Sequence, residues 1–423
     1  MPRSLRVQTD YIEKVKIAVK RNGYPRQKDL AEDLNISLAT LSNFLNGRPV
    51  DNLNFIEICR RIEQDWQAIA VLDENSDEQD SSEEPELLCS DFYVERVPNE
   101  AQCYEAILKP GALIRLKAPQ QMGKTMLIKR VLFQAREQGY QTLTLSFELA
   151  DSTIFSDLRQ FLRWFCASVG QSLGLPNKLD EYWDDIFGCN TNAKDYFQDY
   201  LLPKISSPLV LALDKVDLVF EHPNVANDFC RLLRSWYDLA RRGDRSSILW
   251  KKLRLVVVHS TEVYSSLDIN HSPLAGVGLV VELPEFSPEQ VQDLARLHGL
   301  DWSATHVEQL MAMIGGHPSL VQLAFHHIKH QGLALEQMLQ MAPTEAGIYS
   351  DHLRRHLRTL QQHPELAAAF SEVVNTDSWV TIKSDQVFRL HSMGLVKLHG
   401  DSVMPRCDLY RKYFRTRLQA EYR

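Results

Sequence analysis

The chain has 423 residues, of which 44% are hydrophobic, and a formal net charge of −8 at pH 7. This length accommodates about two to four domains, and the acidic balance excludes a protein whose whole surface binds nucleic acid. No apolar run approaches the roughly 20 residues of a membrane helix, the N-terminus does not resemble a signal peptide, and the seven cysteines lack CxxC spacing, so we expect a cytoplasmic protein without a membrane partner, zinc site or disulfide framework.

Residues 1–70 are predicted to form a small all-α domain of the helix-turn-helix type. The first 50 residues carry nine Lys and Arg against five Asp and Glu. Two helices, over residues 27–34 and 37–46, each place apolar residues on one inward face. These inward residues are Leu30, Ala31, Leu34, Leu41 and Leu45. The residues expected to face duplex DNA are Lys28, Leu38, Ala39, Thr40, Ser42, Asn43 and Arg48.

A second interpretation of this N-terminal domain stays open. Its outward face lacks arginine, and its basic excess is small. A helical module that binds another protein and never touches DNA would have the same pattern. Residues 71–87, which follow, are mostly acidic with serines, and they predict a disordered linker.

A phosphate-binding loop is predicted at residues 118–125, whose sequence is APQQMGKT. It follows the apolar run 112–116 and precedes a helical pattern over residues 126–138, as such a loop should. Its backbone N–H groups would face the β- and γ-phosphates, and Ala118 replaces the usual first glycine. The residues expected to surround the nucleotide here are Pro119, Gln120, Gln121, Met122, Gly123, Lys124, Thr125 and Met126, with the Thr125 hydroxyl on Mg²⁺.

The apolar run 208–213 ends in Asp214, as expected for a buried strand of a parallel sheet. Asp214 would then lie at the ligand-binding edge of the sheet and hold Mg²⁺. In many hydrolysing P-loop proteins the next residue is a glutamate that polarises the attacking water. Here it is Lys215, which cannot act as a base while protonated, and Asp217 is the nearest replacement carboxylate. Asp214 and Asp217 are thus the catalytic candidates, and hydrolysis is expected to be slow.

Strands and helices alternate after the loop, which predicts a parallel sheet with right-handed crossovers. The strands are expected over residues 141–147, 208–214 and 253–258, and the helices over residues 158–173 and 227–240. His259, Ser260 and Thr261 follow the last strand, where a polar group would read the γ-phosphate. For this reason His259 is counted among the expected nucleotide contacts, although the sequence does not show which of the three residues makes the contact.

Several phrases of the sequence resemble the AAA-like domain common in filamentous cyanobacteria, a P-loop ATPase related to the STAND class. They are residues 94–100, 162–166, 182–188, 259–262 and 344–349. The resemblance extends over residues 88–418. The N-terminal part is similar to the phage-repressor-type helix-turn-helix found in vWA-MoxR-associated systems.

This resemblance implies a nucleotide-binding domain at 88–285, a helical lid at 286–345 and a winged helix at 346–423. The whole would be a multi-domain α/β protein, with the small helix-turn-helix domain ahead of a P-loop parallel sheet.

The resemblance also implies further contacts to the nucleotide. Val94 and Arg96 would border the adenine, and Pro318 would pack near it from the lid. Cys407 stands where many relatives have a histidine on the β-phosphate of ADP, and Arg406 could replace that contact.

Two functions from different classes follow. The first is a switch controlled by ATP, ADP and Mg²⁺, which forms a homo-oligomer in the ATP state and engages DNA, or a protein effector, through residues 1–70. The second is a DNA-remodelling or loader ATPase that assembles on nucleic acid. An arginine finger would favour the second, and the candidates for it are Arg241, Arg242 and Arg245.

Overall fold

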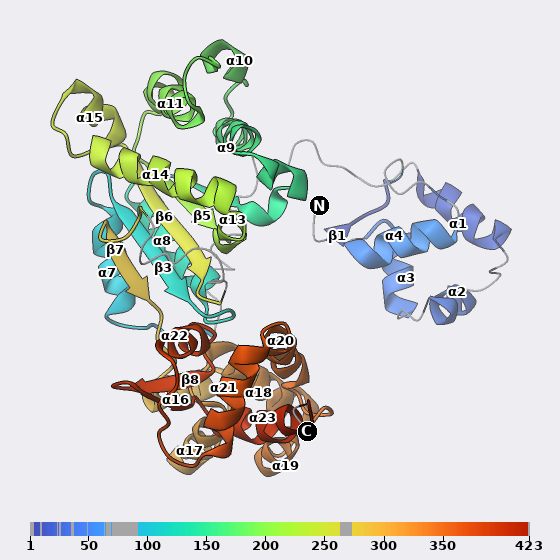
Figure 1. The fold of residues 1–423 in the computed structure, drawn as a ribbon. Coiled ribbons are helices and arrows are strands. Elements are labelled where there is room, and N and C mark those ends of the chain that lie inside the picture. Colours follow the sequence, from blue (N-terminus) through green and yellow to red (C-terminus); the bar gives the residue numbers. More distant parts are fainter. Residues whose placement is uncertain are drawn as a thin grey trace. The chain divides into compact units, whose positions relative to one another are not determined.

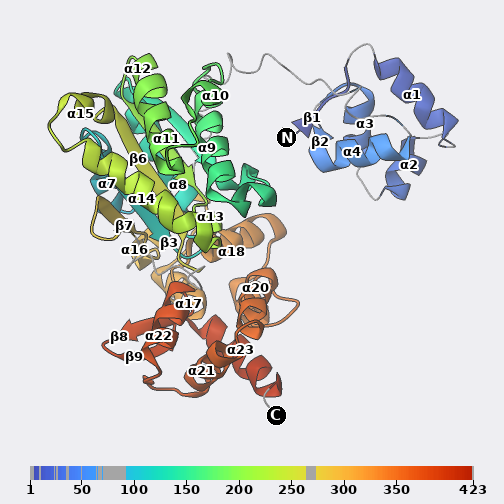
Figure 2. The ribbon, with the colours of Figure 1, turned by 45° about the horizontal axis from the view of Figure 1, so that its top comes forward.

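The computed structural model describes residues 4–8, 11–22, 24, 27–34, 38–48, 50–62, 64, 69, 92–262 and 273–421. The chain divides into two compact units, residues 1–87 and 88–423 (Figures 1 and 2). The predicted linker, residues 71–87, lies outside the described residues. Within the part that is described, every helix is too short or too polar to cross a membrane.

The N-terminal unit is a small helical domain with its own hydrophobic core. Leu30, Leu41 and Leu45 are buried there, as the helical pattern predicted, and the rings of Phe44 and Phe55 meet edge-on with centroids 5.0 Å apart. Because this core takes residues only from the first 69, the unit needs no apolar surface from the rest of the chain. Its elements are β1 (Ser4–Leu5), α1 (Ile12–Arg21), α2 (Gln27–Asp33), α3 (Leu38–Leu45), β2 (Val50–Asp51) and α4 (Asn52–Arg61).

The larger unit contains the predicted parallel sheet, which has five strands in the order β4-β5-β6-β3-β7. The strands are β3 (Leu113–Ala118), β4 (Gln141–Ser146), β5 (Leu209–Asp214), β6 (Leu253–Ser260) and β7 (Leu279–Glu282). The edge strand β7 was not predicted, because its four residues are too few to show a pattern. In this order β6 lies between the strand that leads into the phosphate loop and the strand that ends in Asp214.

Helices cover both faces of this sheet (Figure 1). Side chains alternate between the two faces of a strand, so Ile114 and Leu116 pack with α7 (Asn99–Ile107) and α8 (Lys124–Glu137). On the opposite face, Leu211 packs among residues of α9 (Leu158–Ser172) and α14 (Pro223–Leu239). The smaller elements of this layer are η2 (Phe147–Leu149), η3 (Ser152–Ser156), α10 (Leu179–Tyr182), α11 (Cys189–Asp195), the π-helical η4 (Tyr196–Leu201), α12 (Leu202–Lys204), α13 (Asp217–Phe220) and α15 (Arg245–Trp250).

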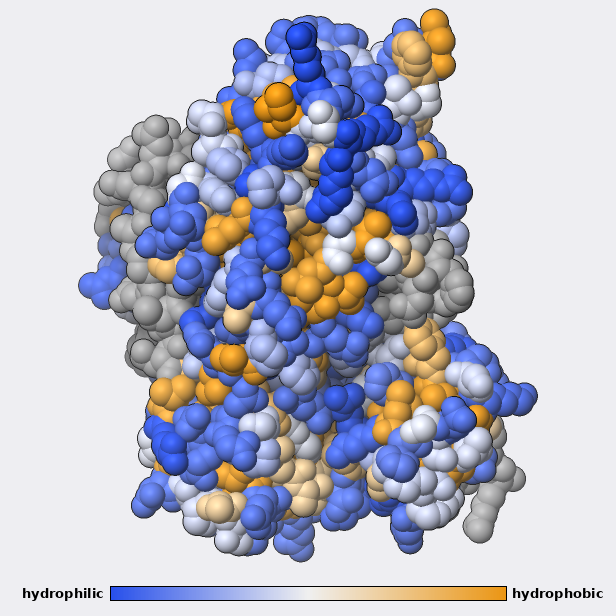
Figure 3. Space-filling view, turned by 90° about the vertical axis from the view of Figure 1, so that its left-hand side faces the viewer, coloured by the Kyte–Doolittle hydropathy of each residue, from blue (hydrophilic) through white to orange (hydrophobic). Residues whose placement is uncertain are grey.

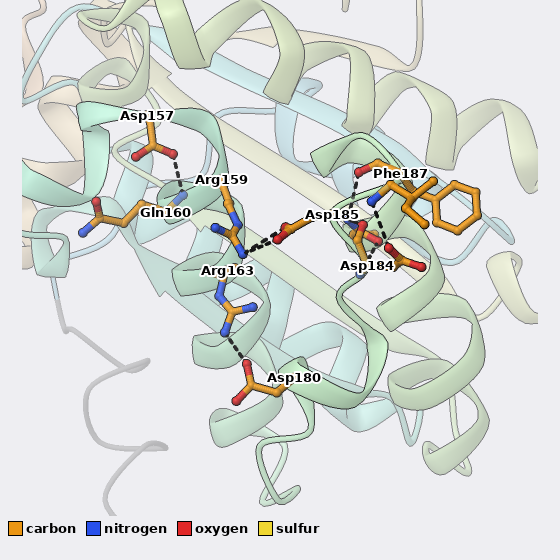
Figure 4. Close-up of polar contacts among 10 residues, drawn as sticks. Asp157, Arg159, Gln160, Arg163, Asp180, Asp184, Asp185 and Phe187 are labelled. Atoms are coloured by element: carbon orange, nitrogen blue, oxygen red, sulfur yellow. Dashed lines mark hydrogen bonds and ion pairs between the residues drawn. The ribbon is translucent and has the colours of Figure 1, made fainter.

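Two of the phrases that carried the family resemblance, residues 162–166 and 182–188, lie against each other in this layer (Figure 4). Arg163 of α9 forms an ion pair of 2.6 Å with Asp180, and its guanidinium also covers the Trp183 ring. One turn earlier, Arg159 pairs with Asp185 at 2.9 Å. These pairs are exposed, so each adds little stability, but together with the Trp183 contact they fix the loop onto α9.

The predicted lid and winged helix, residues 286–345 and 346–423, share one hydrophobic core that runs from Phe286 to Leu418. We call residues 286–421 the C-terminal bundle. Its elements are α16 (Pro288–Leu297), α17 (Ala304–Ile314), α18 (Pro318–Gln331), α19 (Leu335–Met341), α20 (Ser350–Gln361), α21 (Pro364–Asn375), α22 (Ser384–Ser392), β8 (Val396–His399), β9 (Ser402–Pro405) and α23 (Asp408–Glu421). The antiparallel hairpin of β8 and β9 lies between α22 and α23.

The surface is largely hydrophilic, and its apolar residues form separate patches on the face shown in Figure 3. Two exposed apolar side chains, Ile186 and Phe187, belong to the loop that α9 holds. Scattered apolar residues of this kind are ordinary for a protein surface.

Gly316 packs directly against the backbone of Phe286, at the start of the C-terminal bundle. A Cβ at this position would lie 2.0 Å from the carbonyl oxygen of Phe286, whose own N–H donates to Gly316. We expect Gly316→Ala to destabilise the larger unit by about 1–3 kcal/mol, because the backbone must shift. The urea midpoint of that unit measures it. Gly188→Ala, where nothing lies within 4 Å, is the matched control, and equal midpoints for both variants would contradict the prediction.

Candidate nucleotide-binding site

The phosphate loop joins β3 to α8 and is closed around the Lys124 ammonium. Nζ of Lys124 donates to the carbonyl oxygens of Ala118 at 2.9 Å and Pro119 at 2.7 Å. Gly123 precedes the helix with φ of 88°, a left-handed conformation that favours glycine. The first backbone N–H groups of α8 are consequently left without helical partners at the loop, where they can bind an anion.

The loop is held from behind by Arg96. Its guanidinium donates to the carbonyl oxygens of Met122 at 2.7 Å and Pro284 at 3.4 Å, and the backbone N–H of Arg96 donates to the Glu100 carboxylate at 2.9 Å. A Cβ on Gly123 would lie 2.5 Å from Nη2 of Arg96. The φ angle favours glycine here, and a larger residue would also displace the end of the Arg96 side chain.

A cavity of about 730 Å³ opens in front of this loop. Its walls come from the loop, the segment 92–96, the end of β5, α13 and the start of α18. The predicted site residues that line it are Val94, Arg96, Gln120, Gln121, Gly123, Lys124, Thr125, Met126, Asp214, Asp217 and Pro318. The volume is that of an ordinary small-molecule site.

Other predicted residues lie elsewhere. Met122 is itself part of the loop, where its side chain is buried and its carbonyl oxygen accepts from Arg96. Pro119, His259 and Arg406 line a second cavity of about 400 Å³. Arg406 forms an ion pair of 2.6 Å with Glu285 there, so the structure gives no support to its predicted contact with the β-phosphate.

His259, Ser260 and Thr261, at the end of β6, line two different cavities. Alternate residues of a strand face opposite sides, so Ser260 lines the first cavity whereas His259 and Thr261 line the second. Burial lowers the pKa of His259 to about 3, which leaves it neutral. Of the three residues that the sequence could not separate, Ser260 is the one that lines the same cavity as the phosphate loop.

Glu262 is a functional candidate that the motif reasoning passed over. Its carboxylate accepts the Gln120 N–H of the phosphate loop at 2.8 Å, and burial raises its pKa. Asp217 is also occupied, because its Oδ1 accepts the Ser260 N–H at 2.9 Å. The signal that could have indicated Glu262 is its place two residues after the end of β6, at the edge of the sheet where parallel strands position ligand-binding groups.

Burial and neighbouring carboxylates act in opposite directions on the pKa of Lys124. Burial lowers the pKa of its ammonium to about 8, while Asp217, Glu262 and Asp214 oppose this shift. Burial also raises the pKa of Asp214. Thr125 and Asp214 line the same cavity, and a hydroxyl with a carboxylate is a donor set that suits Mg²⁺.

Two residues of the site have a strained backbone. Within the described part of the chain, Gln121 and Lys215 are the non-glycine residues with positive φ, at 60° and 59°. Such conformations cost about 1–3 kcal/mol each and concentrate at functional sites. The Lys215 ammonium pairs with Glu148 at 3.0 Å, and both residues line the cavity.

The C-terminal bundle reaches the phosphate loop directly, which no motif indicated. On α20, Arg355 donates to the side-chain oxygen of Gln121 at 3.3 Å, and Nδ1 of His352 lies 3.4 Å from the same oxygen. Nε2 of His352 lies 2.8 Å from the Tyr410 hydroxyl of α23. A change in the position of the Gln121 side chain would therefore alter contacts of α20 and, through His352, of α23.

The predicted DNA-contacting residues lie on or beside α2 and α3 of the N-terminal unit. Lys28 and Arg48 are exposed, whereas Thr40, Ser42 and Asn43 are half-buried. The side chains of Leu38 and Ala39 lie outside the described part of the structure.

Comparison with known proteins identifies the larger unit. A family model described as an AAA-like domain matches residues 81–416. The fold is similar to a Walker-type ATPase of Pyrococcus abyssi, with a TM-score of 0.52 and 14% identity over 76% of this chain and 96% of that one. A STAND protein with a tetratricopeptide repeat sensor from Pyrococcus horikoshii has a TM-score of 0.35 and 16% identity over 77% of this chain and 42% of that one. Comparison with curated proteins gave no match.

The pKa of Lys124 predicts how ADP binding depends on pH. Below about pH 8 the ammonium carries its proton and attracts phosphate, whereas above it the free protein must take up a proton in order to bind. Affinity should therefore fall by up to about tenfold per pH unit above pH 8. Calorimetry from pH 7 to 9.5 measures this.

Lys124→Ala is the control for this titration. Without the ammonium, the variant should bind ADP at least about tenfold more weakly at pH 7, since a charge-assisted contact contributes about 1.5–3 kcal/mol. Its affinity should lack the decline above pH 8. Equal affinities of variant and parent at pH 7 would rule out the phosphate-loop role of Lys124.

Proposed function

This chain belongs to the AAA-like domain family, and we propose from this that it binds ATP and ADP with Mg²⁺ and uses them as a conformational switch. One observation carries the proposal: a single cavity takes its walls from both the phosphate loop and α18 of the C-terminal bundle. A nucleotide bound there would touch both parts of the larger unit. Its phosphate state would then bias their arrangement.

The cavity offers a distinct place for each part of the nucleotide. The N–H groups at the start of α8 and the Lys124 ammonium would hold the phosphates, with Mg²⁺ between Thr125 and Asp214. The base would lie toward Val94 and Pro318, which also line the cavity. Val94 packs on the core of the C-terminal bundle, so the base would also be read by that bundle.

The switch would work through Gln121. Its side chain contacts Arg355 and His352 of α20, and its backbone is held in a left-handed conformation. Phosphates bound by the loop would compete for or reorient this residue, and α20 would follow. The similarity to the fold of the Walker-type ATPase of Pyrococcus abyssi supports this proposal.

Slow hydrolysis fits a switch that must hold its ATP state. Lys215 occupies the position after Asp214 and carries a cation, which its ion pair with Glu148 stabilises. Asp214, Asp217 and Glu262 are the carboxylates whose charges act on Lys124. Of the two that are not assigned to Mg²⁺, Glu262 is the better candidate for orienting water, because its carboxylate accepts the Gln120 N–H of the phosphate loop.

The output we propose is DNA binding through the helix-turn-helix of residues 1–70, strengthened when the ATP form assembles into oligomers. The exposure of Lys28 and Arg48 supports this, and the separate core of the N-terminal unit suits a module tethered by a linker. The loader-type alternative needs an arginine finger. Arg241 already donates to the carbonyl oxygens of Gly111 and Tyr237, which leaves Arg242 and Arg245 as the exposed candidates.

Hydrolysis should rise when the cation after Asp214 is replaced. Lys215→Glu would place two carboxylates together, so the informative variant combines it with Glu148→Gln. This double variant should turn over ATP faster by as much as about 10²–10⁴, the contribution of a positioned general base. Glu148→Gln alone is the control and should change turnover little. If the parent hydrolyses several ATP molecules per second and the double variant is slower, Lys215 does not limit hydrolysis.

DNA binding should depend on nucleotide and on a few cations. Full-length protein with an ATP analogue should retain duplex DNA from a random-sequence pool at about 50 mM salt, and more weakly with ADP. Lys28→Gln combined with Arg48→Gln should reduce the salt slope by about two, whereas Arg60→Gln, an exposed arginine of α4, is the control. Chromatographic size should increase with the ATP analogue.

If neither the full chain nor residues 1–70 retain DNA under these conditions, the N-terminal unit is a protein-binding module. The chain is then a signalling adaptor, and the nucleotide switch itself is unaffected.

A further inference from the structure

We propose that Lys215 distinguishes ATP from ADP: its ammonium leaves Glu148 and binds the γ-phosphate when ATP occupies the site. Lys215 and Glu148 both line the nucleotide cavity, where their side chains pair at 3.0 Å. This role rests on the nucleotide binding proposed above, and it adds the group that reads the third phosphate. Lys215 would then act on the switch directly, besides being unable to serve as a base.

The sheet places Lys215 at the edge where the phosphates would lie. β4 and β5 pair in parallel with Ser146 opposite Asp214, so the residues that follow the two strands lie at the same edge. Lys215 follows β5 directly, and Glu148 is two residues beyond β4. Burial is the main cause of the lowered pKa of Lys124, and the charge of Lys215 lowers it further. The two ammonium groups therefore act on the same part of the cavity.

The cavity wall around Lys215 is otherwise acidic. Apart from Lys215, the charged residues that the described segment 148–221 contributes to this wall are Glu148, Asp214, Asp217 and Glu221. A third phosphate adds negative charge to the nucleotide, so a wall of carboxylates alone would repel it. Mg²⁺ on Asp214 would offset one of these carboxylates. Lys215 is the cation that this wall itself can offer to the γ-phosphate.

The backbone at Lys215 directs this side chain away from the path of the strand. Its φ angle of 59° is left-handed, and its N–H donates to the Asp214 carboxylate at 2.9 Å, which holds the turn. Strain of this kind persists where the surrounding structure fixes it, and it is concentrated at ligand contacts. The conformation therefore supports a role for the Lys215 ammonium at the ligand.

The pair with Glu148 is one that a phosphate can displace. The side chains of Lys215 and Glu148 are 43% and 58% exposed, and an exposed ion pair adds little stability. Although burial acts against it, the carboxylates of Glu148, Asp214 and Asp217 raise the pKa of Lys215, so its charge is retained at neutral pH. A bound nucleotide excludes water, which strengthens a charge-assisted bond to phosphate. ADP lacks the group that would compete with Glu148.

The test is calorimetric titration of the full-length protein, in Mg²⁺, with ADP and with adenylyl imidodiphosphate, an ATP analogue that is not hydrolysed. In Lys215→Gln the ratio of analogue affinity to ADP affinity should fall at least about tenfold, because a charge-assisted contact to the third phosphate is lost. ADP affinity should change little. Lys215→Arg keeps the charge and should retain most of the ratio. The control is Lys109→Gln, an exposed lysine after α7.

Glu148→Gln should shift the ratio upward severalfold, because it removes the carboxylate that competes for Lys215. Glu221→Gln removes another carboxylate of the same wall, so it shows how much of that gain is due to charge alone, and its effect should be smaller. In the Lys215→Gln background, Glu148→Gln should lose most of its effect, since direct competition makes the two changes non-additive.

Three results would overturn the role of Lys215. They are an unchanged affinity ratio in Lys215→Gln, an equal loss of ADP and analogue affinity in that variant, and strictly additive effects of Lys215→Gln and Glu148→Gln. Lys215→Gly adopts the positive φ without strain, so it tests the same charge if Lys215→Gln fails to fold.

The same titrations separate this role from the proposed switch. If the parent binds both nucleotides and Lys215→Gln leaves their affinity ratio unchanged, the role of Lys215 fails and the nucleotide switch stands. If the parent binds neither nucleotide, both fail.

Discussion

The buried guanidinium of Arg96 is the contact on which the rest of the larger unit depends. It is 3% exposed, and a charge so buried must be hydrogen-bonded. Its donors meet the phosphate loop at Met122 and the chain just ahead of the C-terminal bundle at Pro284, and it lies 5.1 Å from the Phe286 ring centroid. Desolvation lowers its pKa, yet it stays charged at any physiological pH. Loop and bundle are thus positioned by one side chain.

Local patterns predicted the parts of this molecule that local forces build. The parallel strands, α8 after the phosphate loop and the Asp214 strand all follow from apolar runs and a compact motif, and the cavity gathers most of the residues that they indicated. The sequence could not indicate that Arg355 and His352 would meet Gln121, because more than 200 residues separate them. Nor could it show that lid and winged helix would share one core, since that depends on packing.

The position after Asp214 shows how chemistry and backbone strain are combined. Lys215 adopts a left-handed conformation that a long side chain normally avoids, and its own N–H donates to the Asp214 carboxylate. The strand has ended there, so the lysine does not follow the alternation of β5. Its ammonium turns instead toward Glu148, which follows the neighbouring strand β4. If Lys215 is assumed to continue strand β5, its ammonium is therefore placed wrongly.

The strand order has a consequence for communication across the sheet. β6 pairs along its length with β3 and β5, so it cannot slide or tilt without breaking both ladders. At the end of β6, Ser260 lines the nucleotide cavity, whereas His259 and Thr261 line the second cavity, and the Thr261 hydroxyl donates to the Ser392 carbonyl oxygen of α22. The sheet is thus a rigid frame, and the end of β6 contacts both the nucleotide cavity and the C-terminal bundle. Thermodynamic linkage then requires reciprocity: whatever factor a bound nucleotide imposes on the stability of the contact between Thr261 and α22, that contact imposes on the affinity for the nucleotide.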